Sequence, residues 1–221
     1  MGTVTGERDA LVQRAVALMR DDRRVLLGIT GSPGAGKTTI AKQLVASIDA
    51  TVGSDEEEPA AAYLPMDGYH LANSTLDRLG IHDRKGAIDT FDGWGFVAML
   101  RRLLNETDHT VYAPSFDRNV DEGIAGEIAI PPSAPIIVVE GNYLLIDRAP
   151  WADIRGLLAE TWFCETPEAE RLRRLVDRHE RHGRSSEEAE AWAKTVDGAN
   201  AELIEPTQVR ADLTVFGVPS D

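Results

Sequence analysis

A glycine-rich loop between a buried strand and an amphipathic helix constrains the fold of this chain more than any other feature. The apolar run Val25–Thr30 predicts the strand, and the loop Gly31–Thr38 follows it at once with the pattern G-x-x-x-x-G-K-[ST]. From Lys37 or Thr38 to about Ile48, apolar residues recur at helical spacing. A strand, a glycine loop and a helix in this order indicate a unit of a parallel α/β sheet.

The loop Gly31–Thr38, called the phosphate loop below, has the chemistry of a site for phosphate groups. Glycines let backbone N–H groups approach a large oxyanion, and the following helix adds the positive potential of its N-terminus. The Lys37 ammonium can reach the β- and γ-phosphates of a nucleotide, and the Thr38 hydroxyl can coordinate Mg²⁺. We therefore predict that ATP is bound by Gly31, Ser32, Gly34, Ala35, Gly36, Lys37, Thr38 and Thr39.

The charge of the chain limits its partners. Its 221 residues include 37 acidic and 23 basic ones, a formal net charge of −14. Such a surface repels nucleic-acid backbones and anionic lipid, so we expect neither nucleic acid nor a membrane as partner. An anionic ligand therefore needs a local concentration of positive groups.

Cysteine usage and hydropathy indicate the class of protein. The single cysteine, Cys164, excludes an intrachain disulfide and a thiolate metal cluster, and its apolar neighbours predict a small buried side chain. The sequence has neither a run of ~20 apolar residues nor the pattern of a signal peptide. We expect a soluble, cytoplasmic protein.

The rest of the chain alternates predicted strands and helices. Further strands are expected at about 62–66, 110–113, 127–130, 136–139, 161–164 and 213–216, and further helices at about 8–20, 92–105, 168–182 and 186–203. Segment 49–60, with its acidic run, is expected to be a surface loop. The pattern predicts one α/β domain with a mainly parallel sheet, a core at about 25–216 and a hairpin at about 110–130.

Two carboxylates follow predicted strands. Asp67 comes directly after strand 62–66 and Glu140 directly after strand 136–139. The carboxyl ends of parallel strands meet at the ligand-binding edge of a sheet, so both carboxylates should lie beside the phosphate loop. One can hold Mg²⁺ and the other can accept a proton from an acceptor hydroxyl, although an acid at a strand end is also a common turn cap. His70, three residues after Asp67, is either a substrate contact or an ordinary hydrogen-bonded surface histidine.

Arginines are concentrated in the segment 171–186. Six of the 23 basic residues lie there, namely Arg171, Arg173, Arg174, Arg178, Arg181 and Arg184. They either pair with neighbouring acids on a solvated helix or belong to a lid that offsets charge on a transferring phosphoryl group. Spacing alone does not distinguish which of them point inward. Gly183 is expected to end the helix or to act as a hinge.

Taken together, these motifs resemble the superfamily of P-loop kinases that contains uridine kinase, phosphoribulokinase and the bacterial type I pantothenate kinases. The resemblance covers about 25–216 and is closest to short bacterial kinases of the nucleoside- and sugar-kinase type. It depends on the phosphate loop, Met66–His70, Lys85–Asp92, Tyr112–Arg118, Val139–Leu145 and the arginine segment. Two departures leave the acceptor open: Ser115–Arg118 replaces the tyrosine-serine-histidine hairpin of the pantothenate kinases, and Arg178-His179 replaces the arginine–aspartate of uridine kinases.

The resemblance implies a three-layer P-loop NTPase fold, with a mainly parallel five-stranded sheet flanked by helices, a small β-hairpin and a helical lid. It also implies ATP-dependent, Mg²⁺-dependent transfer of the γ-phosphoryl group to a hydroxyl of a small metabolite. Asp67 would be the base. Glu140 would be the acidic residue associated with Mg²⁺, beside the Thr38 hydroxyl as a second ligand. Acceptor contacts would come from His70, Tyr112, Arg118, Asn142 and Asn200, and lid contacts from Arg174, Arg178 and Arg184.

Other functions remain open on the sequence alone. A nucleotide-hydrolysing switch or chaperone would use the same phosphate loop without a small-molecule acceptor, and a non-catalytic nucleotide-binding module would need no base. The sequence contains no N-K-x-D element of guanine specificity. The acceptor can be a nucleoside, pantothenate or a sugar. Homodimers are common among kinases of this type, so a homodimer is one expected state of assembly.

Overall fold

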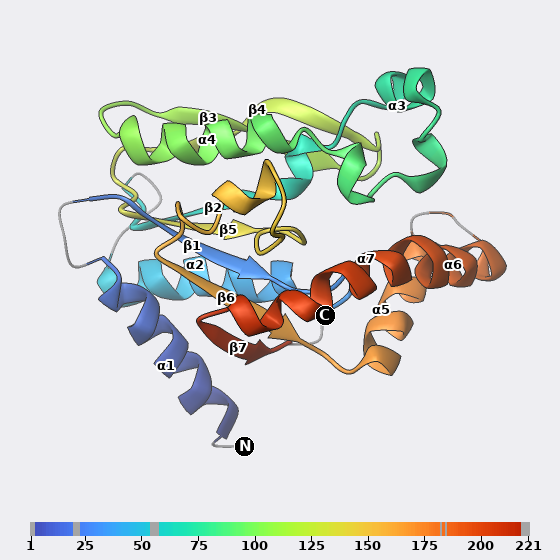
Figure 1. Ribbon diagram of the computed structural model, residues 1–221. Helices are drawn as coiled ribbons and strands as arrows, with labels where there is room; N and C mark the ends of the chain where they lie inside the picture. Colours follow the sequence, from blue (N-terminus) through green and yellow to red (C-terminus); the bar gives the residue numbers. More distant parts are fainter. Residues whose placement is uncertain (1–2, 20–22, 54–57, 182, 184, 218–221) are drawn as a thin grey trace.

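The centre of the molecule is a sheet of five strands that all run parallel, in the order β2-β5-β1-β6-β7 (Figure 1). The computed structural model describes residues 3–19, 23–53, 58–181, 183 and 185–217. The strands are β1 (Val25–Thr30), β2 (Ala61–Pro65), β5 (Ile136–Glu140), β6 (Glu160–Glu165) and β7 (Leu213–Phe216). The predicted parallel sheet is confirmed.

Helices cover both faces of this sheet and make three layers. Helices α1 (Thr3–Ala17) and α2 (Lys37–Val52) lie on one face, and α4 (Gly93–Asn105) lies on the other (Figure 1). Successive strand residues therefore enter two separate cores: Leu27 packs with the residues of α1 and α2, and its neighbour Leu26 packs with those of α4. The three-layer prediction is confirmed.

Strand β5 shows why these sequence runs are continuously apolar. All of its residues are buried, because its two faces meet the two cores and its edges pair with β1 and β2. The run nevertheless ends in Glu140, which is also buried. A carboxylate in such a place costs free energy unless it has partners, so the end of β5 marks a place where chemistry outweighs packing.

The hairpin is a second, two-stranded antiparallel sheet made of β3 (Val111–Asp117) and β4 (Glu122–Ile130). Both strands continue closer to the turn than predicted. The sequence there contains Pro114 and Gly126, which are typical of loops, but a register shift beside Pro114 absorbs them into the ladder. The Asp117 carboxylate accepts the N–H groups of the two residues Asn119 and Val120 and so closes the turn.

The C-terminal half of the chain contains the helices α5 (Glu168–Arg181), α6 (Ser186–Trp192) and α7 (Gly198–Ile204). Gly183 has φ of +94° and ends the α5 segment, as predicted. The predicted helix 186–203 is interrupted by a π-helical turn at Ala193–Asp197. His182 and Arg184 lie outside the described residues.

Helices α2 and α3 also differ from the sequence prediction. Helix α2 continues to Val52, where the prediction placed a loop, because Gly53 supplies the left-handed cap only at that point. Helix α3 (Asn73–Leu79) was not predicted, since one short turn-rich segment gives no periodic signal. The acidic residues 55–57 lie outside the described residues. In the described part of the chain, no helix combines the length and the apolar character that crossing a bilayer requires.

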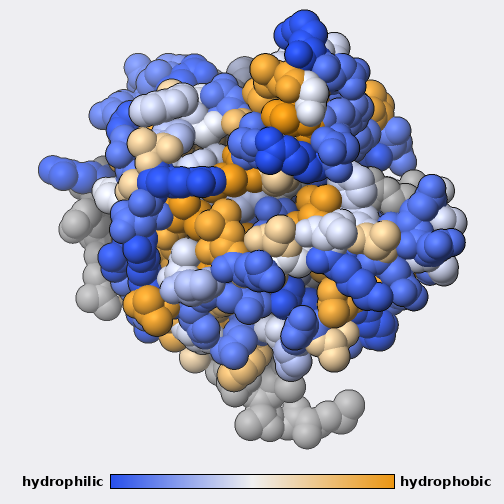
Figure 2. All heavy atoms as spheres, turned by 45° about the vertical axis from the view of Figure 1, so that its right-hand side comes forward, coloured by the Kyte–Doolittle hydropathy of each residue, from blue (hydrophilic) through white to orange (hydrophobic). Residues whose placement is uncertain are grey.

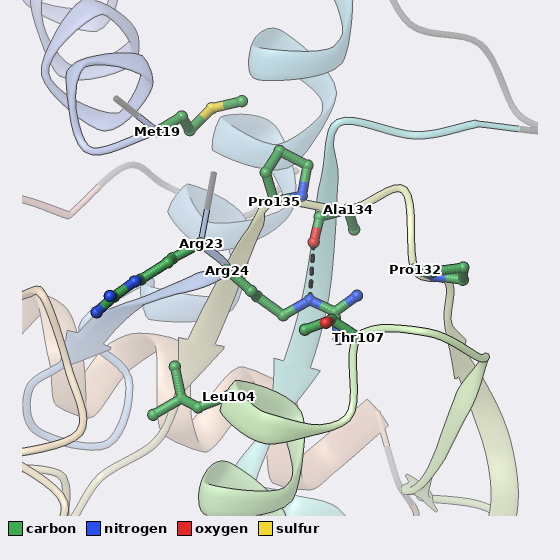
Figure 3. A pocket seen from close by; sticks show the side chains of 8 residues that line it. All are labelled: Met19, Arg23, Arg24, Leu104, Thr107, Pro132, Ala134 and Pro135. Carbon is green, nitrogen blue, oxygen red and sulfur yellow. Dashed lines mark hydrogen bonds between the residues drawn. The ribbon is translucent and has the colours of Figure 1, made fainter. Parts of the chain in front are cut away.

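A buried arginine fixes the edge of the sheet opposite the phosphate loop. The guanidinium of Arg24, directly before β1, donates to the carbonyl oxygen of Ala134 at 2.9 Å (Figure 3). It also donates to the carbonyl oxygens of Pro131 (2.7 Å), Leu103 (3.3 Å) and Glu106 (3.2 Å). Leu103 and Glu106 lie at the C-terminus of α4, whose partial negative charge compensates the cation. Burial lowers the pKa of Arg24. We call Arg24 and these four carbonyl groups the clamp. Arg24 and Ala134 of the clamp line a neighbouring cavity of about 700 Å³.

Replacing this clamp should destabilise the protein without touching the phosphate loop. We expect Arg24→Met to lower the free energy of unfolding by about 3 kcal/mol, because several buried carbonyl groups lose their donors. The matched control is Arg23→Met, which removes an exposed arginine from the same cavity and should change stability by less than about 0.5 kcal/mol. Urea unfolding of both variants measures the difference, and equal effects would contradict the clamp.

Candidate active site

A cavity of about 910 Å³ opens at the carboxyl ends of the strands. Figure 2 turns this side of the molecule forward, and hydrophilic side chains predominate on it. The cavity brings together most of the predicted site residues from six separate stretches of chain. Those that line it are Gly34, Gly36, Lys37, Thr38, Thr39, Asp67, His70, Arg118, Glu140, Asn142, Arg174, Arg178 and Asn200.

Backbone conformation in the phosphate loop requires glycine. Gly34 and Gly36 have φ of +77° and +90°, which side-chain-bearing residues rarely adopt. A Cβ atom on Gly34 would also lie 2.7 Å from the carbonyl oxygen of Arg171 in the lid helix. Helix α2 begins directly after Gly36, so its first N–H groups face the cavity edge with the positive end of the helix dipole. The loop is therefore built to receive an anion.

Lys37 places an ammonium group below this loop. The residue is only 7% exposed, and its Nζ donates to the carbonyl oxygen of Ser32 at 3.0 Å. Burial lowers the pKa of Lys37, whereas the nearby carboxylates of Glu140 and Asp67 oppose that shift. The neighbouring Cys164 is buried, as predicted, and burial raises the pKa of its thiol to about 12. Lys37 is thus the cation on which both carboxylates of the site converge.

Glu140 is the last residue of β5 and accepts two hydrogen bonds on one carboxylate oxygen. The Thr38 hydroxyl donates to its Oε2 at 3.1 Å and the Tyr63 hydroxyl donates to the same atom at 2.9 Å. Burial raises the pKa of Glu140, Lys37 lowers it, and Asp67 raises it further, with a net upward shift. A bound cation would offset the free-energy cost of burying the Glu140 carboxylate. Sequence analysis missed Tyr63, because nothing in the pattern of β2 indicates which strand lies beside it.

Thr38 and Glu140 fit a magnesium ion. Mg²⁺ prefers oxygen ligands and commonly uses one or two protein groups, with phosphate oxygens and water completing its shell. A hydroxyl and a buried carboxylate 3.1 Å apart at the mouth of the phosphate loop match this chemistry. No cluster of three or more His, Cys, Asp or Glu side chains suited to a metal occurs within the described ranges. The geometry therefore suits a metal held jointly by the protein and a nucleotide.

Asp67 lies in a 3-10 turn, Met66–Tyr69, that follows β2. Its Oδ2 accepts from the Arg118 guanidinium at 3.1 Å. Burial raises the pKa of Asp67, but His70, Arg118 and other nearby cations lower it by more, so the pKa lies below its usual range and the group is ionised near neutral pH. Gly68 permits this contact: a Cβ there would lie 2.2 Å from the carbonyl oxygen of Pro114, so only glycine lets the hairpin approach the turn.

His70 forms part of an aromatic wall beside Asp67. Its ring centroid lies 4.0 Å from that of Phe91 and 4.6 Å from that of Phe116. Its Nδ1 donates to the carbonyl oxygen of Asp67 at 2.7 Å, since a carbonyl oxygen can only accept. Burial lowers the pKa of His70, with Asp67 opposing the shift. The residue therefore lines the cavity and is also hydrogen-bonded.

Lys85 is a further cation of the cavity, which sequence analysis quoted only within a motif. Its side chain is 8% exposed, and its Nζ donates to Asp121 Oδ2 at 2.9 Å and to Asn73 Oδ1 at 2.5 Å. The next residue, Gly86, has a carbonyl oxygen that accepts from Asn200 Nδ2 at 3.0 Å. Asn200, assigned to the acceptor by resemblance, thus also holds the loop that carries Lys85.

The arginines of α5 divide between the two interpretations. Arg174, Arg178 and Arg181 line the cavity. Arg173 is exposed and pairs with neighbouring acids on the same helix. Arg171 is buried and donates to Glu205 at 2.7 Å, so it supports the phosphate loop from behind. The predicted lid residue Arg184 lies outside the described residues.

Four predicted contacts do not line the cavity. Gly31, Ser32 and Ala35 belong to the phosphate loop but lie behind its inner surface. Tyr112 is 59% exposed on β3, because strand alternation buries its neighbours Val111 and Ala113 and turns Tyr112 outward. The hairpin residues that reach the cavity are instead Phe116, Arg118, Asn119 and Asp121, at its turn. The assignment of Tyr112 to the acceptor therefore loses its geometric basis.

Comparisons with known proteins agree with one another. The model of the family described as "Phosphoribulokinase / Uridine kinase family" matches residues 26–221. A protein of Schizosaccharomyces pombe named "putative uridine kinase" is 32% identical, over 94% of this chain and 89% of that protein. A uridine kinase of Clostridium perfringens is 30% identical, over 87% of each.

The fold comparison gives a similar result. The crystal structure of a "putative fructose transport system kinase" from Silicibacter sp. TM1040 superimposes with a TM-score of 0.83 and 37% identity, covering 94% of this chain and 98% of that one.

The proposed metal position leads to a prediction that needs no turnover. We expect the gain in ATP affinity that Mg²⁺ produces to be at least ~10-fold smaller in Glu140→Gln than in wild type. The reason is that the amide lacks the charge that holds the cation. Calorimetric titration of ATP at several Mg²⁺ concentrations measures this. Glu165→Gln is the matched control, since Glu165 ends another strand of the same sheet, β6, is exposed and accepts a hydrogen bond from Gln208. Unchanged Mg²⁺ dependence in Glu140→Gln would exclude the carboxylate as a ligand.

Proposed function

Because the chain belongs to the phosphoribulokinase/uridine kinase family, we propose that it transfers the γ-phosphoryl group of ATP to a hydroxyl of a small polar metabolite, with Asp67 as the base. The family and the relatives named as kinases make the chain a phosphotransferase, a small-molecule kinase. The observation that carries the finer proposal is the shared cavity. In it an ionised carboxylate, Asp67, lines the same space as the phosphate loop and lies within electrostatic reach of Lys37.

The phosphate side of the cavity would bind and orient ATP. Backbone N–H groups of the phosphate loop and the Lys37 ammonium would hold the β- and γ-phosphates. Thr38 and Glu140 would hold Mg²⁺, which when bound neutralises charge on the phosphate oxygens. Arg174 and Arg178 of the lid would offset the charge that spreads over the transferring group. Lys37, Thr38 and Glu140 are already held by hydrogen bonds, so these three groups need little reorganisation.

Asp67 would activate the acceptor. Its carboxylate would accept the proton of the acceptor hydroxyl as the oxygen forms its bond to phosphorus and the bond to the leaving ADP oxygen breaks. The bond from Arg118 orients the carboxylate, and the lowered pKa keeps it unprotonated. Since a lowered pKa means that protonation occurs only as the pH falls through that value, activity should be lost on the acid side and not near neutrality.

The acceptor end of the cavity favours a sugar-type acceptor. A nucleoside base held between two rings, in van der Waals contact on both faces, would need a gap of ~7 Å between them. The His70 ring already contacts the rings of Phe91 and Phe116, so it leaves no such gap beside either of them. Hydrogen-bonding side chains surround the same region, among them Arg118, Asn119 and Asn142. Several polar partners at short range suit a polyhydroxy compound.

The test is coupled ADP release with Mg-ATP against ketoses, aldoses, glycerate, nucleosides and pantothenate. We expect one acceptor, of sugar type, to raise the rate at least ~100-fold over basal hydrolysis. Asp67→Asn should lower kcat by about 10²–10⁴-fold with little change in the KM for ATP. Asp153→Asn is the control and should keep wild-type rates, because Asp153 is an exposed acid that pairs with Arg101 of α4 and does not line the cavity.

Three results would change the proposal. A rate within a few-fold of wild type in Asp67→Asn would reject Asp67 as the base. A nucleoside or pantothenate as the best acceptor would keep the kinase and reject the sugar. A flat panel with slow hydrolysis would favour the nucleotide-hydrolysing switch or chaperone over a small-molecule kinase of this substrate range.

A further inference from the structure

The helical segment Ala193–Glu205, called the brace below, has polar residues on its buried face. It runs from the π-helical turn through α7 to the start of the next 3-10 turn. Its buried positions share one helix face, namely Ala193, Asp197, Asn200, Ala201 and Ile204. Burying a carboxylate and an amide on such a face costs free energy unless hydrogen bonds or ion pairs compensate it. Their partners therefore indicate what the brace does.

Asp197 holds the lid. Its Oδ2 accepts from His179 Nε2 at 2.8 Å, and its Oδ1 lies 3.9 Å from Arg178 Nη2. Both partners are neighbours on α5, so one carboxylate holds His179 by a hydrogen bond and forms a longer ion pair with Arg178. Asp197 is the last residue of the π-helical turn, a feature that often occurs at functional sites because it changes the direction of side chains within a helix.

Arg178 in turn faces the reacting groups. It lines the same cavity as Lys37, Asp67 and Glu140. Its charge lowers the pKa of both Lys37 and Asp67, so the guanidinium lies within electrostatic reach of the phosphate side and of the base. Burial lowers the pKa of Arg178, and Asp197 is the main group that opposes this shift. In the proposed function, the phosphoryl group would pass between Lys37 and Asp67.

The other polar residues of the brace also form hydrogen bonds with groups beside the cavity. Asn200 bonds the Gly86 carbonyl beside Lys85, and Tyr143 Oη lies 2.8 Å from Asn200 Oδ1. Glu205 accepts from the Ser32 hydroxyl at 3.3 Å and from Arg171 at 2.7 Å. The brace thus touches the lid, the acceptor side and the phosphate loop through polar contacts, while its apolar residues pack against the sheet. Polar contacts of this kind orient site residues and do not fill a core.

We propose that Asp197 is a positioning residue, whose carboxylate holds Arg178 and His179 so that the Arg178 guanidinium meets the γ-phosphate of the bound nucleotide. This rests on the proposed function, since it assumes ATP in the phosphate loop. A long arginine side chain that is restrained beforehand loses less conformational freedom when the nucleotide binds. Asp197 would act through Arg178 and would not itself touch the nucleotide.

The test is a double-mutant cycle on nucleotide binding, which needs no acceptor. Calorimetry on the full chain compares Mg-AMP-PNP, which has a γ-phosphate, with Mg-ADP, which lacks one. We expect Arg178→Ala and Asp197→Asn each to weaken binding of Mg-AMP-PNP by about 10-fold, and the double variant to be no weaker than Arg178→Ala alone. Binding of Mg-ADP should stay within about 2-fold in each variant, because the missing contact is to the γ-phosphate.

Two further variants separate positioning from folding. Asp212→Asn removes a carboxylate that accepts the N–H of Thr161 at the far end of β6, and it should leave both affinities unchanged. Asp197→Glu keeps the charge and should retain the affinity for Mg-AMP-PNP within about 3-fold. Thermal unfolding without nucleotide checks that every variant is folded.

Equal loss of affinity for the two nucleotides in Asp197→Asn would mean a purely structural role and overturn the proposal. So would additive effects in the double variant, since Asp197 would then not act through Arg178. A flat acceptor panel in wild type, by contrast, rejects the proposed function and leaves this cycle fully interpretable.

Discussion

The buried ammonium of Lys37 is the interaction on which the rest of the site depends. Two carboxylates, Asp67 and Glu140, lie close enough to oppose the downward shift in its pKa. Without this cation they would repel each other, and Glu140 already has a raised pKa because of its burial. In a chain of net charge −14, this arrangement provides a local site for an anion without a basic surface. Backbone amides supply the remaining positive potential, and they do so without adding net charge.

The topology of the sheet is what brings these charges together. The register pairs Glu140 with Ile29 of β1 on one side and with Pro65 of β2 on the other. The phosphate loop begins two residues after Ile29, and Asp67 follows Pro65 by two residues. Three adjacent parallel strands therefore end beside one another, and each contributes one part of the site. Helices on both faces exclude water from the strands below, which strengthens the electrostatic interactions at their ends.

Local patterns were sufficient to predict part of this structure. The glycine loop, the apolar strands and the acids that end them are each contained in a few consecutive residues, so the parallel sheet and the convergence of Asp67 with Glu140 followed from the sequence. Contacts that depend on tertiary neighbours did not: Tyr63 donates to Glu140 from the adjacent strand β2, and Asp197 contacts His179 of α5, which lies 18 residues away in the sequence. Tyr112 lies outside the cavity, because a resemblance assigns only a position in a hairpin, whereas strand alternation decides which face the residue occupies.

The central claim is that Lys37, together with the amides of the phosphate loop, holds the phosphates of ATP. The most direct measurement is the calorimetric affinity of Mg-ATP for Lys37→Met, which keeps an unbranched side chain only one atom shorter and removes the charge. The account predicts a loss of affinity of at least ~100-fold, because a charged hydrogen bond in a buried site is removed and the two carboxylates are left without their cation. An affinity within about 3-fold of wild type, in a variant that unfolds at the same temperature, would contradict it.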